Sequence, residues 1–306
     1  RSVAVTGVQT CALPICAAWY STHAKGLHNA EILQGKPLSY NNILDLQATL
    51  ELCQKLRHSA AVIVKHNNPC GVAEANSLAE ALNKAIQSDP VSCFGGIVAL
   101  NKEVDEATAK ILSDIFFECI LAPAFSNASL EILGRKKNLR LLKLQDLHLQ
   151  TEFEMKTVAG GFIVQKPDQS YGQTDAWRSL GVPLSSDHQI LEDLLFGEKV
   201  CGALKSNAIA IVKNGQTLGL GMGQVNRVDS VELAIQRWQK HQGQVSSPVL
   251  ISDAFFPFKD SIERIAAVGI RWVLQPGGSV RDEEVIQAAN DHGINLVLTG
   301  IRHFRH

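Results

Sequence analysis

The sequence predicts an α/β protein in which a largely parallel or mixed sheet carries helices on its faces. Three observations support this fold class. Apolar runs of strand length alternate with segments whose apolar residues recur at helical spacing. The 306 residues suffice for one large domain or two smaller ones, each with a hydrophobic core. Hydrophobic residues make up 45% of the chain and charged residues 19%, as in ordinary globular proteins.

Charge, hydropathy and cysteine content argue against several classes of protein. The formal net charge of −1 provides no global basic field for nucleic acid. No apolar run reaches the roughly 18 residues of a membrane span, so we expect no membrane partner. The 7 cysteines show no CxxC spacing, which favours reduced thiols in a cytoplasmic protein over disulfides or a zinc site.

Residues 1–16 are expected to lie outside the fold. Val5–Ile15 reads as the in-frame translation of a common short-read sequencing adapter. A short signal peptide is the alternative, but the stretch has neither a long apolar core nor a clear cleavage motif. We therefore interpret residues 1–16 as a sequencing artefact and predict that they pack poorly.

The first predicted subdomain, residues 17–186, starts with alternating helices and strands. Its regular part is a helix with Ile43, Leu46, Leu50, Cys53 and Leu56 on one face, a strand at 60–64, a helix opened by the capping-box spacing of Ser77–Glu80, a strand at 97–100, a helix over 104–115, and strands at 119–122 and 139–142. Residues 144–186 are less regular and predict a long connection with a strand near 162–164.

The second predicted subdomain, residues 187–306, starts where Asp187 can cap a helix that carries Ile190, Leu191, Leu194 and Leu195. Asn214-Gly215 lies between apolar runs at 208–212 and 217–220 and predicts one antiparallel hairpin. Strands at 249–251, 272–274 and 294–298 then alternate with helices near 260–268 and 282–292. A weak repeat, in which 62–71 is similar to 272–278 and 88–90 to 252–254, suggests two related halves.

Polar residues follow the buried strand at 60–64 directly. Lys65, His66, Asn67 and Asn68 come at its carboxyl end, where α/β folds bind ligands. Histidine titrates near neutrality and lysine supplies positive charge, so the segment can be a proton-handling cluster. A loop shaped by Asn and Pro, with a solvated lysine, explains the segment taken alone just as well.

Two other motifs are weak by themselves. Pro69-Cys70 is similar to zinc deaminases, but no second cysteine follows at the deaminase spacing and the chain has no His-x-Glu, so we predict no metal site. Gly219–Gly223 does not match the dinucleotide fingerprint and is typical of a tight turn. Arg227 beside it can fork onto a phosphate or a carboxylate.

Taken together, a series of segments resembles the bifunctional AICAR formyltransferase/IMP cyclohydrolase family, in family order from about residue 17 to the end. The segments are Gly35–Asn42, Val64–Gly71, Ser88–Gly96, Lys205–Ala208, Gly221–Gln224, Ser252–Phe258, Gln275–Ser279 and Arg302–His306. The resemblance implies a reaction of de novo purine synthesis. In it, the 5-amino group of AICAR ribonucleotide attacks the formyl carbon of the co-substrate 10-formyltetrahydrofolate.

The resemblance also implies roles for individual residues. It implies His66 as the proton acceptor, Lys65 as the group that stabilises the transition state, and Asn207 as the residue that holds the substrate and polarises the reacting groups. It places AICAR contacts at Gly95, Glu118, Arg227, Phe255 and Arg302, and folate contacts at Asp260, Ser279 and Val280. Glu118 stands where the family also has an Asp.

The same resemblance implies tandem cytidine-deaminase-like α/β/α subdomains without zinc, and a homodimer with active sites at its interface. Two departures stand out. The cyclohydrolase domain is absent, and so is an Arg-Tyr-Gly-x-Asn-Pro-His-Gln block that should precede Ala17–Tyr20 and contact AICAR. An inactive ligand-binding or dimerisation module and a deaminase-like hydrolase are therefore the alternatives to a formyltransferase.

Overall fold

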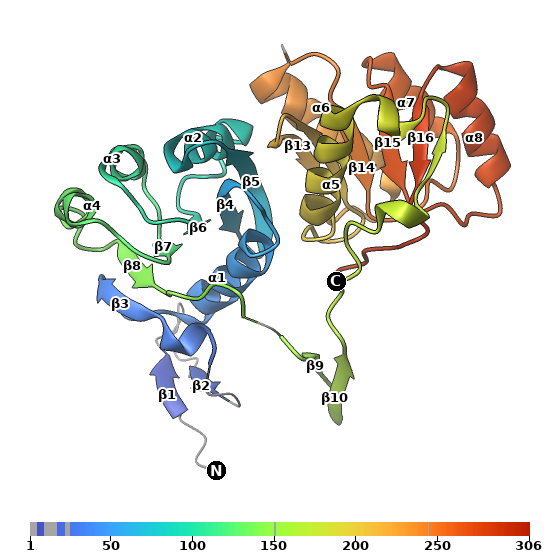
Figure 1. Ribbon diagram of the computed structural model, residues 1–306. Helices are drawn as coiled ribbons and strands as arrows, with labels where there is room; N and C mark the ends of the chain where they lie inside the picture. The colour runs from blue at the N-terminus through green and yellow to red at the C-terminus, as the bar shows by residue number, and fades with distance from the viewer. Residues whose placement is uncertain (1–4, 9–16, 22–24, 150, 244) are drawn as a thin grey trace.

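The computed structural model describes residues 5–8, 17–21, 25–149, 151–243 and 245–306. Its main feature is a 12-stranded mixed sheet with helices on both faces, which confirms the predicted α/β class. Figure 1 shows the first half of the chain, coloured blue to green, and the second half, coloured yellow to red, as two neighbouring lobes. None of the helices in the described part is long and apolar enough to cross a membrane.

The N-terminal segment is described only in part. Of residues 1–16, the structure describes strand β1 (Val5–Val8), which pairs with β2 (Ala17–Tyr20) as a separate two-stranded sheet. The rest of the predicted artefact, with Cys11 and Cys16, lies outside the described residues. The poor packing expected for residues 1–16 stays a prediction.

The first half contains the predicted elements and three that the sequence analysis did not predict. Its elements are β3 (Glu31–Gln34), α1 (Tyr40–Cys53), β4 (Ser59–Lys65), β5 (Asn68–Ala75), α2 (Leu78–Ser88), β6 (Ile97–Leu100), α3 (Glu106–Asp114), β7 (Cys119–Ala122), α4 (Asn127–Leu133) and β8 (Arg140–Lys143). The unpredicted ones are β3, β5 and α4. Ser77 caps α2 as expected, because its hydroxyl accepts a hydrogen bond from Glu80 N.

The second half starts after a connection that contains β9 (Glu154–Val158), β10 (Gly161–Gln165) and β11 (Arg178–Leu180). Its elements are α5 (His188–Cys201), β12 (Ile209–Lys213), β13 (Gln216–Gly221), α6 (Arg227–Gln242), β14 (Val249–Ser252), α7 (Asp260–Ala267), β15 (Trp272–Gln275), α8 (Asp282–Asp291) and β16 (Asn295–Leu298). Asp187 caps α5, which confirms that expectation, and Asn214-Gly215 forms the predicted hairpin turn.

The two halves repeat one order of elements: a helix, a hairpin, and then helices alternating with strands. In the sheet, the order β5-β4-β6-β7-β8 of the first half matches β13-β12-β14-β15-β16 of the second. The two halves therefore share one topology, as the weak repeat suggested, and their division into two cytidine-deaminase-like subdomains stays a prediction. The proposed pairing of segments is wrong, because the strand at 60–64 corresponds to β12 and not to the strand at 272–275. Two antiparallel hairpins, not one, lie in the sheet.

The core has two faces because successive strand residues point to opposite sides of the sheet. In β4, Val62 and Val64 pack in the same cluster as residues of α1 and α5, whereas Ala61 and Ile63 pack with residues of α2. On that second face, α6, α7 and α8 cover the other half of the sheet. The cluster under α1 and α5 runs through both halves and links their cores.

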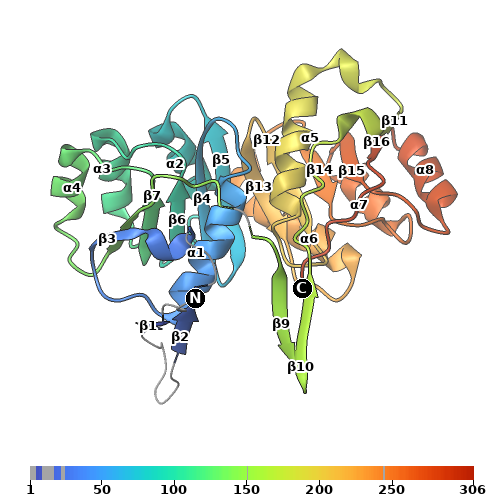
Figure 2. The same cartoon turned by 60° about the horizontal axis from the view of Figure 1, so that its bottom comes forward.

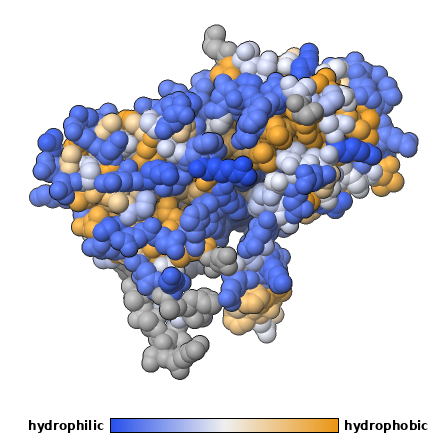
Figure 3. Space-filling view, viewed as in Figure 1, coloured by the Kyte–Doolittle hydropathy of each residue, from blue (hydrophilic) through white to orange (hydrophobic). Residues whose placement is uncertain are grey.

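The hairpin formed by β9 and β10 does not pack against either hydrophobic core. Strands β9 and β10 pair only with each other, and every residue in them is exposed. Figures 1 and 2 show this hairpin projecting away from both lobes, and Figure 3 shows pale hydrophobic surface at its end. Its large exposed apolar residues are Met155, Val158, Phe162, Ile163 and Val164.

Candidate active site

In the first half, the predicted site residues lie at one edge of the sheet. Strand β4 ends at this edge, and β6 and β7 begin there, because β4 and β6 are antiparallel and β6 and β7 are parallel. This arrangement brings Lys65, Gly95 and Glu118 to the same edge. The predicted position of Lys65 at the carboxyl end of a buried strand is confirmed, and the strands beside β4 are antiparallel to it and start where β4 ends.

In the second half, β12 begins at an edge where β13, β14, β15 and β16 all end. Asn207 precedes β12, and Phe255, Ser279 and Arg302 follow the ends of the other strands. Because β5 and β13 run antiparallel, the start of β5 lies at the same edge as the end of β13. The two groups of predicted residues therefore share one edge of the whole sheet.

His66 lies in the tight turn between β4 and β5. The φ angles of His66 and Asn67 are 54° and 59°, which asparagine tolerates better than most residues. Asp45 of α1 supports this turn, because its carboxylate accepts hydrogen bonds from His66 N at 3.3 Å and Asn67 N at 2.6 Å. The imidazole of His66 is exposed and makes no hydrogen bond to any residue that the structure describes.

Lys65 and Asn68 hold the two sides of the turn. The Lys65 ammonium donates to Phe94 O at 2.7 Å, which directs it toward Gly95. Asn68 Oδ1 accepts from Lys205 N at 3.1 Å, across 137 positions in sequence. This bond joins the His66 turn to the segment that contains Asn207. The mutual reach of His66 and Asn207 that the predicted roles require stays a prediction.

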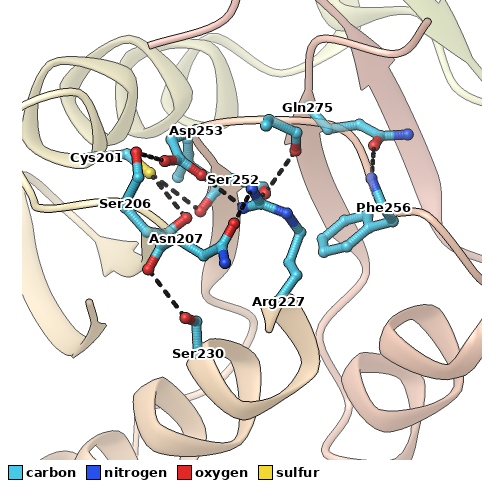
Figure 4. Close-up of polar contacts among 12 residues, drawn as sticks. Cys201, Ser206, Asn207, Arg227, Ser230, Ser252, Asp253, Phe256 and Gln275 are labelled. Carbon is cyan, nitrogen blue, oxygen red and sulfur yellow. Dashed lines mark hydrogen bonds and ion pairs between the residues drawn. The ribbon is translucent and has the colours of Figure 1, made fainter. Parts of the chain in front are cut away.

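Asn207 lies in a network of buried polar groups, drawn in Figure 4. Its Nδ2 donates to Gln224 O at 2.9 Å, and its Oδ1 accepts from Arg227 Nη2 at 2.7 Å. Arg227 Nη1 in turn donates to Ser252 Oγ at 2.9 Å and to Asp253 Oδ1 at 2.5 Å. Side chains of Arg227 and Asp253 are 6% and 0% exposed, so they form a buried ion pair. Arg227 therefore binds a carboxylate inside the protein, but through Nη1 alone, because Nη2 binds Asn207, and a forked contact is not formed.

Glu118 and Arg140 form a second ion pair at this edge. Arg140 Nη1 lies 2.7 Å from Glu118 Oε2, and Arg140 Nε donates to the carbonyls of Lys36 and Pro37. Gly95 is held beside them, because its N–H donates to Phe116 O and its φ of 76° suits a residue without a Cβ.

The residues assigned to folate surround the ends of β14 and β15. Asp260 is exposed at the start of α7, and Val280 is fully exposed. Ser279 N donates to Asp282 Oδ1 at 3.0 Å. The Arg302 guanidinium lies 4.8 Å from the centre of the Phe255 ring, in a cation–π contact.

A cavity of about 1000 Å³ adjoins the segment that contains Asn207. Its walls come from α1, the β9–β10 hairpin and the C-terminal tail, and they include Glu51, Lys55, Tyr171, Lys205 and Arg305. The Lys55 ammonium lies 3.9 Å from the centre of the Tyr171 ring. Burial lowers the pKa of Lys55 to about 8, although the charge of Glu51 opposes this shift.

Cys70 has a cysteine neighbour that sequence spacing did not reveal. A side-chain hydrogen bond with Cys70, together with burial, raises the pKa of the Cys93 thiol. No group of three or more His, Cys, Asp or Glu side chains suited to a metal occurs in the part of the chain that the structure describes. The prediction of no metal site stays a prediction.

Two residues of the site were not predicted as functional. Asp45 and Asp253 each join segments that are distant in sequence. A polar residue fully buried beside a strand end is the usual sign of such a role, but burial of Asp253 is visible only in the folded chain.

The sequence profile of one known family matches this chain. The profile described as AICARFT/IMPCHase bienzyme covers residues 16–237, well over half of the chain. The chain belongs to this family.

Individual relatives agree with this assignment. A bifunctional purine biosynthesis protein PurH from Synechococcus elongatus is 48% identical over 298 residues, which cover 95% of this chain and 57% of the relative. PurH of Synechocystis sp. is 48% identical over 295 residues, with the same coverage, and PurH of Aquifex aeolicus is 45% identical over 284 residues, covering 92% of this chain and 55% of the relative. The chain thus spans somewhat more than half the length of these relatives.

The residue range matched by the AICARFT/IMPCHase profile includes only some of the predicted site residues. The matched range includes Lys65, His66, Asn207 and Arg227. Phe255, Asp260, Ser279 and Arg302 lie beyond residue 237, in the region that only the longer matches to PurH proteins reach.

Proposed function

We propose that this chain carries out the formyltransferase reaction of its family, the transfer of the formyl group of 10-formyltetrahydrofolate to the 5-amino group of AICAR ribonucleotide. The family match supports the reaction class. The observation that carries the assignment to this edge of the sheet is the hydrogen bond from Lys205 N to Asn68. It joins the His66 turn to the Asn207 network.

In the proposed reaction, a C–N bond forms between the AICAR amine and the formyl carbon, and the bond from that carbon to N10 of the folate breaks. His66, whose imidazole is exposed in the turn, accepts a proton from the amine. The folate nitrogen takes up a proton as it leaves. The Lys65 ammonium has three N–H donors, and one of them donates to Phe94 O. The other two stay available to the oxyanion that develops on the formyl group.

The substrates are proposed to bind along the same edge. Asn207 holds AICAR in an orientation fixed by its bonds to Arg227 and Gln224. Arg227 uses three of its N–H groups inside the protein, and we propose that it contacts AICAR with the others. Exposed Arg302 over Phe255 suits an anionic nucleotide.

The folate is proposed to bind beyond the ends of β14 and β15. Val280 and Phe258 expose apolar surface there, and Asp260 presents a carboxylate. Apolar surface with a few polar groups is what a large aromatic ligand requires. The reaction as proposed needs no metal.

The finer description of the whole protein is also a proposal. We propose two cytidine-deaminase-like subdomains, residues 17–186 and 187–306, because both halves share one order of strands and helices. We further propose a cytoplasmic homodimer with active sites at its interface, which the exposed apolar β9–β10 hairpin supports.

The first test is the formation of formyl-AICAR from AICAR ribonucleotide and 10-formyltetrahydrofolate. It uses this chain and a version in which residues 1–16 are replaced by the Arg-Tyr-Gly-x-Asn-Pro-His-Gln block. We expect product from the second version and weak or no product from the first, since the chain lacks that block. If neither version makes product, the proposed function is wrong.

The second test assigns the proton acceptor. In the version with the restored block, we expect His66→Ala to lower kcat by roughly 10²- to 10⁴-fold while the KM for AICAR changes little, because a general base acts on the transition state. His292→Ala, at the exposed end of α8, is the matched control and should keep full activity. Unchanged turnover in His66→Ala would rule out this role.

A further inference from the structure

His303 is a buried histidine in the C-terminal tail to which no role is assigned above. Its side chain is 4% exposed and lies between two carboxylates. Its Nδ1 is 2.6 Å from Asp168 Oδ2, a short hydrogen bond. Its Nε2 is 3.5 Å from Glu198 Oε1, which is too long for a good hydrogen bond and makes this contact an ion pair. Asp168 belongs to the long connection and Glu198 to α5, so three separate segments meet at this imidazole.

This surrounding favours the imidazolium form of His303. The Glu198 side chain is 1% exposed, and among the described residues its other oxygen accepts a hydrogen bond only from Gly172 N, at 2.7 Å. A buried carboxylate that lacks a cation is costly. Burial by itself would lower the pKa of His303, but the hydrogen bond to Asp168 and the charges of Asp168 and Glu198 raise it to about 9.

The tail that His303 anchors is bonded directly to the candidate active site. His303 N donates to Asp253 O at 2.9 Å. Two residues later, Arg305 N donates to Ser206 Oγ at 3.1 Å, and Ser206 N donates to Arg305 O at 2.9 Å. The Ser206 hydroxyl also donates to Asp253 Oδ2 at 2.5 Å. The tail thus supports both Asp253, which holds Arg227, and Ser206, which precedes Asn207.

We propose that His303 is a positioning residue of this site: as an imidazolium between Asp168 and Glu198, it fixes the C-terminal tail that supports Asn207 and places Arg302 over Phe255. The inference rests on the proposed function for its catalytic consequence only. The side chain of His303 contacts neither Asn207 nor Arg302. His303 therefore acts on these residues through the position of the tail.

The other groups that face His303 are few. The Tyr171 ring stacks on the imidazole, with centroids 4.6 Å apart and planes 4° from parallel. Lys55 caps the far side of that ring, and the Arg305 charge lies close enough to lower the pKa of Lys55. Cys201 of α5 lies near Tyr171, and burial raises the pKa of both. On the site side, the Asp253 carboxylate is committed to Arg227 and Ser206.

The sign of the pH dependence follows from the raised pKa. The proton on His303 stabilises the folded tail fully below pH 6.5, the ordinary value for histidine, and this contribution is lost as the pH rises through about 9. We therefore expect the tail to loosen when the pH is raised above neutrality and to stay fixed when the pH is lowered slightly below neutrality.

The experiment compares His303→Gln with the control His292→Gln. Amide hydrogen exchange at Ser206 and Arg305 measures the position of the tail, whether or not the chain is active. We expect His303→Gln to speed this exchange by about tenfold or more. It should also weaken binding of AICAR ribonucleotide by about tenfold. In the unmodified chain, the exchange rate divided by that of an unfolded amide at the same pH should rise with a midpoint near pH 9, and this midpoint should vanish in His303→Gln.

A second variant separates the proposed role from general destabilisation. If His303 acts by neutralising Glu198, then Glu198→Gln added to His303→Gln should restore part of the lost protection, because no buried charge is left unpaired. Unchanged exchange and AICAR binding in His303→Gln, or a pH midpoint that persists in it, would overturn the positioning role. Absence of product in the version with the restored Arg-Tyr-Gly-x-Asn-Pro-His-Gln block, with these exchange results intact, would count against the proposed function alone.

Discussion

Asp253 is the residue on which most of the site network converges. One carboxylate oxygen accepts from Arg227 and the other from Ser206, while its carbonyl accepts from His303 N. Its side chain is fully buried, so water does not stabilise its negative charge. Among the residues described, Arg227 is the only cation within hydrogen-bond distance of this carboxylate. A single residue thereby ties together α6, the segment before β12 and the C-terminal tail.

We expect Asp253→Asn to lower the free energy of unfolding by about 3–5 kcal/mol, because it leaves Arg227 as an unpaired buried charge. It should also weaken AICAR binding, since Arg227 then no longer holds Asn207 in place. Urea denaturation measures the first effect and calorimetric titration with AICAR ribonucleotide the second. Asp291→Asn, on the exposed surface of α8, is the control and should change stability by less than about 0.5 kcal/mol. Equal stability of the two variants would contradict the role given to Asp253.

At the scale of elements, local sequence patterns predicted most strands and helices but not how they meet. Apolar runs located β4, β6, β7 and β12 to within a residue or two, because buried strands are continuously apolar. Strand β5 escaped notice because Asn67, Asn68 and Pro69 are typical of a loop, whereas in the structure a two-residue turn sends the chain straight back along β4.

The residue pattern alone pointed to the segment Lys65–Asn68 and to Arg227, and the family resemblance supplied the other site residues. The supporting residues Asp45, Asp253 and His303 were not predicted. The bond from Lys205 to Asn68 spans 137 positions, and the contact of His303 with Asp168 spans 135. No periodicity or spacing records such pairs, because they depend on which strands become neighbours in the sheet. The local segments could be predicted, and their assembly at one edge could not.

The β9–β10 hairpin offers a prediction at the same scale. An isolated two-stranded hairpin is at best marginally stable in water, and this one has no buried residue. We expect its amides to exchange on the order of 10³-fold faster than those of the β4–β5 hairpin, which lies between β6 and β13 in the sheet. Hydrogen exchange should be measured at a concentration where sedimentation shows a single chain. Equal protection of the two hairpins under that condition would disprove the expectation.

For the whole molecule, the sheet joins the two halves through hydrogen bonds between β5 and β13, beside the apolar cluster that both halves share. Strands β5 and β13 pair at Gln216 and Ala73, and Glu74 N donates to Gly215 O at 2.8 Å. Away from the sheet, Gln216 Nε2 donates to Lys84 O and Gln242 Nε2 to Gln87 O. Since both candidate half-sites depend on this junction for their relative position, its integrity governs the site as well as the fold.

Thr217 lies at the centre of this junction and gives the means to test it. Its fully buried hydroxyl accepts from Val72 N at 3.0 Å and lies 2.8 Å from Ser88 Oγ, while Ser88 Oγ donates to Thr217 O at 2.6 Å. Thr217→Val keeps the shape of the side chain but leaves Val72 N without its partner. We expect it to lower the free energy of unfolding by about 1–3 kcal/mol, the cost of an unsatisfied buried donor.

The control for this prediction is Thr217→Ser, which keeps the hydroxyl and loses only a methyl group. In urea denaturation, the free energy of unfolding should be higher for the unmodified chain and for Thr217→Ser than for Thr217→Val. Circular dichroism reports on both halves, whereas the fluorescence of Trp238 and Trp272 reports on the second half once Trp19 and Trp177 are replaced by phenylalanine in all three chains. Because coincident transitions indicate a single cooperative unit, we expect them in the unmodified chain and a separation of the two signals in Thr217→Val. A Thr217→Val chain as stable as Thr217→Ser, with coincident transitions, would show that the apolar cluster under α1 and α5 suffices to join the halves and that this hydroxyl does not hold them together.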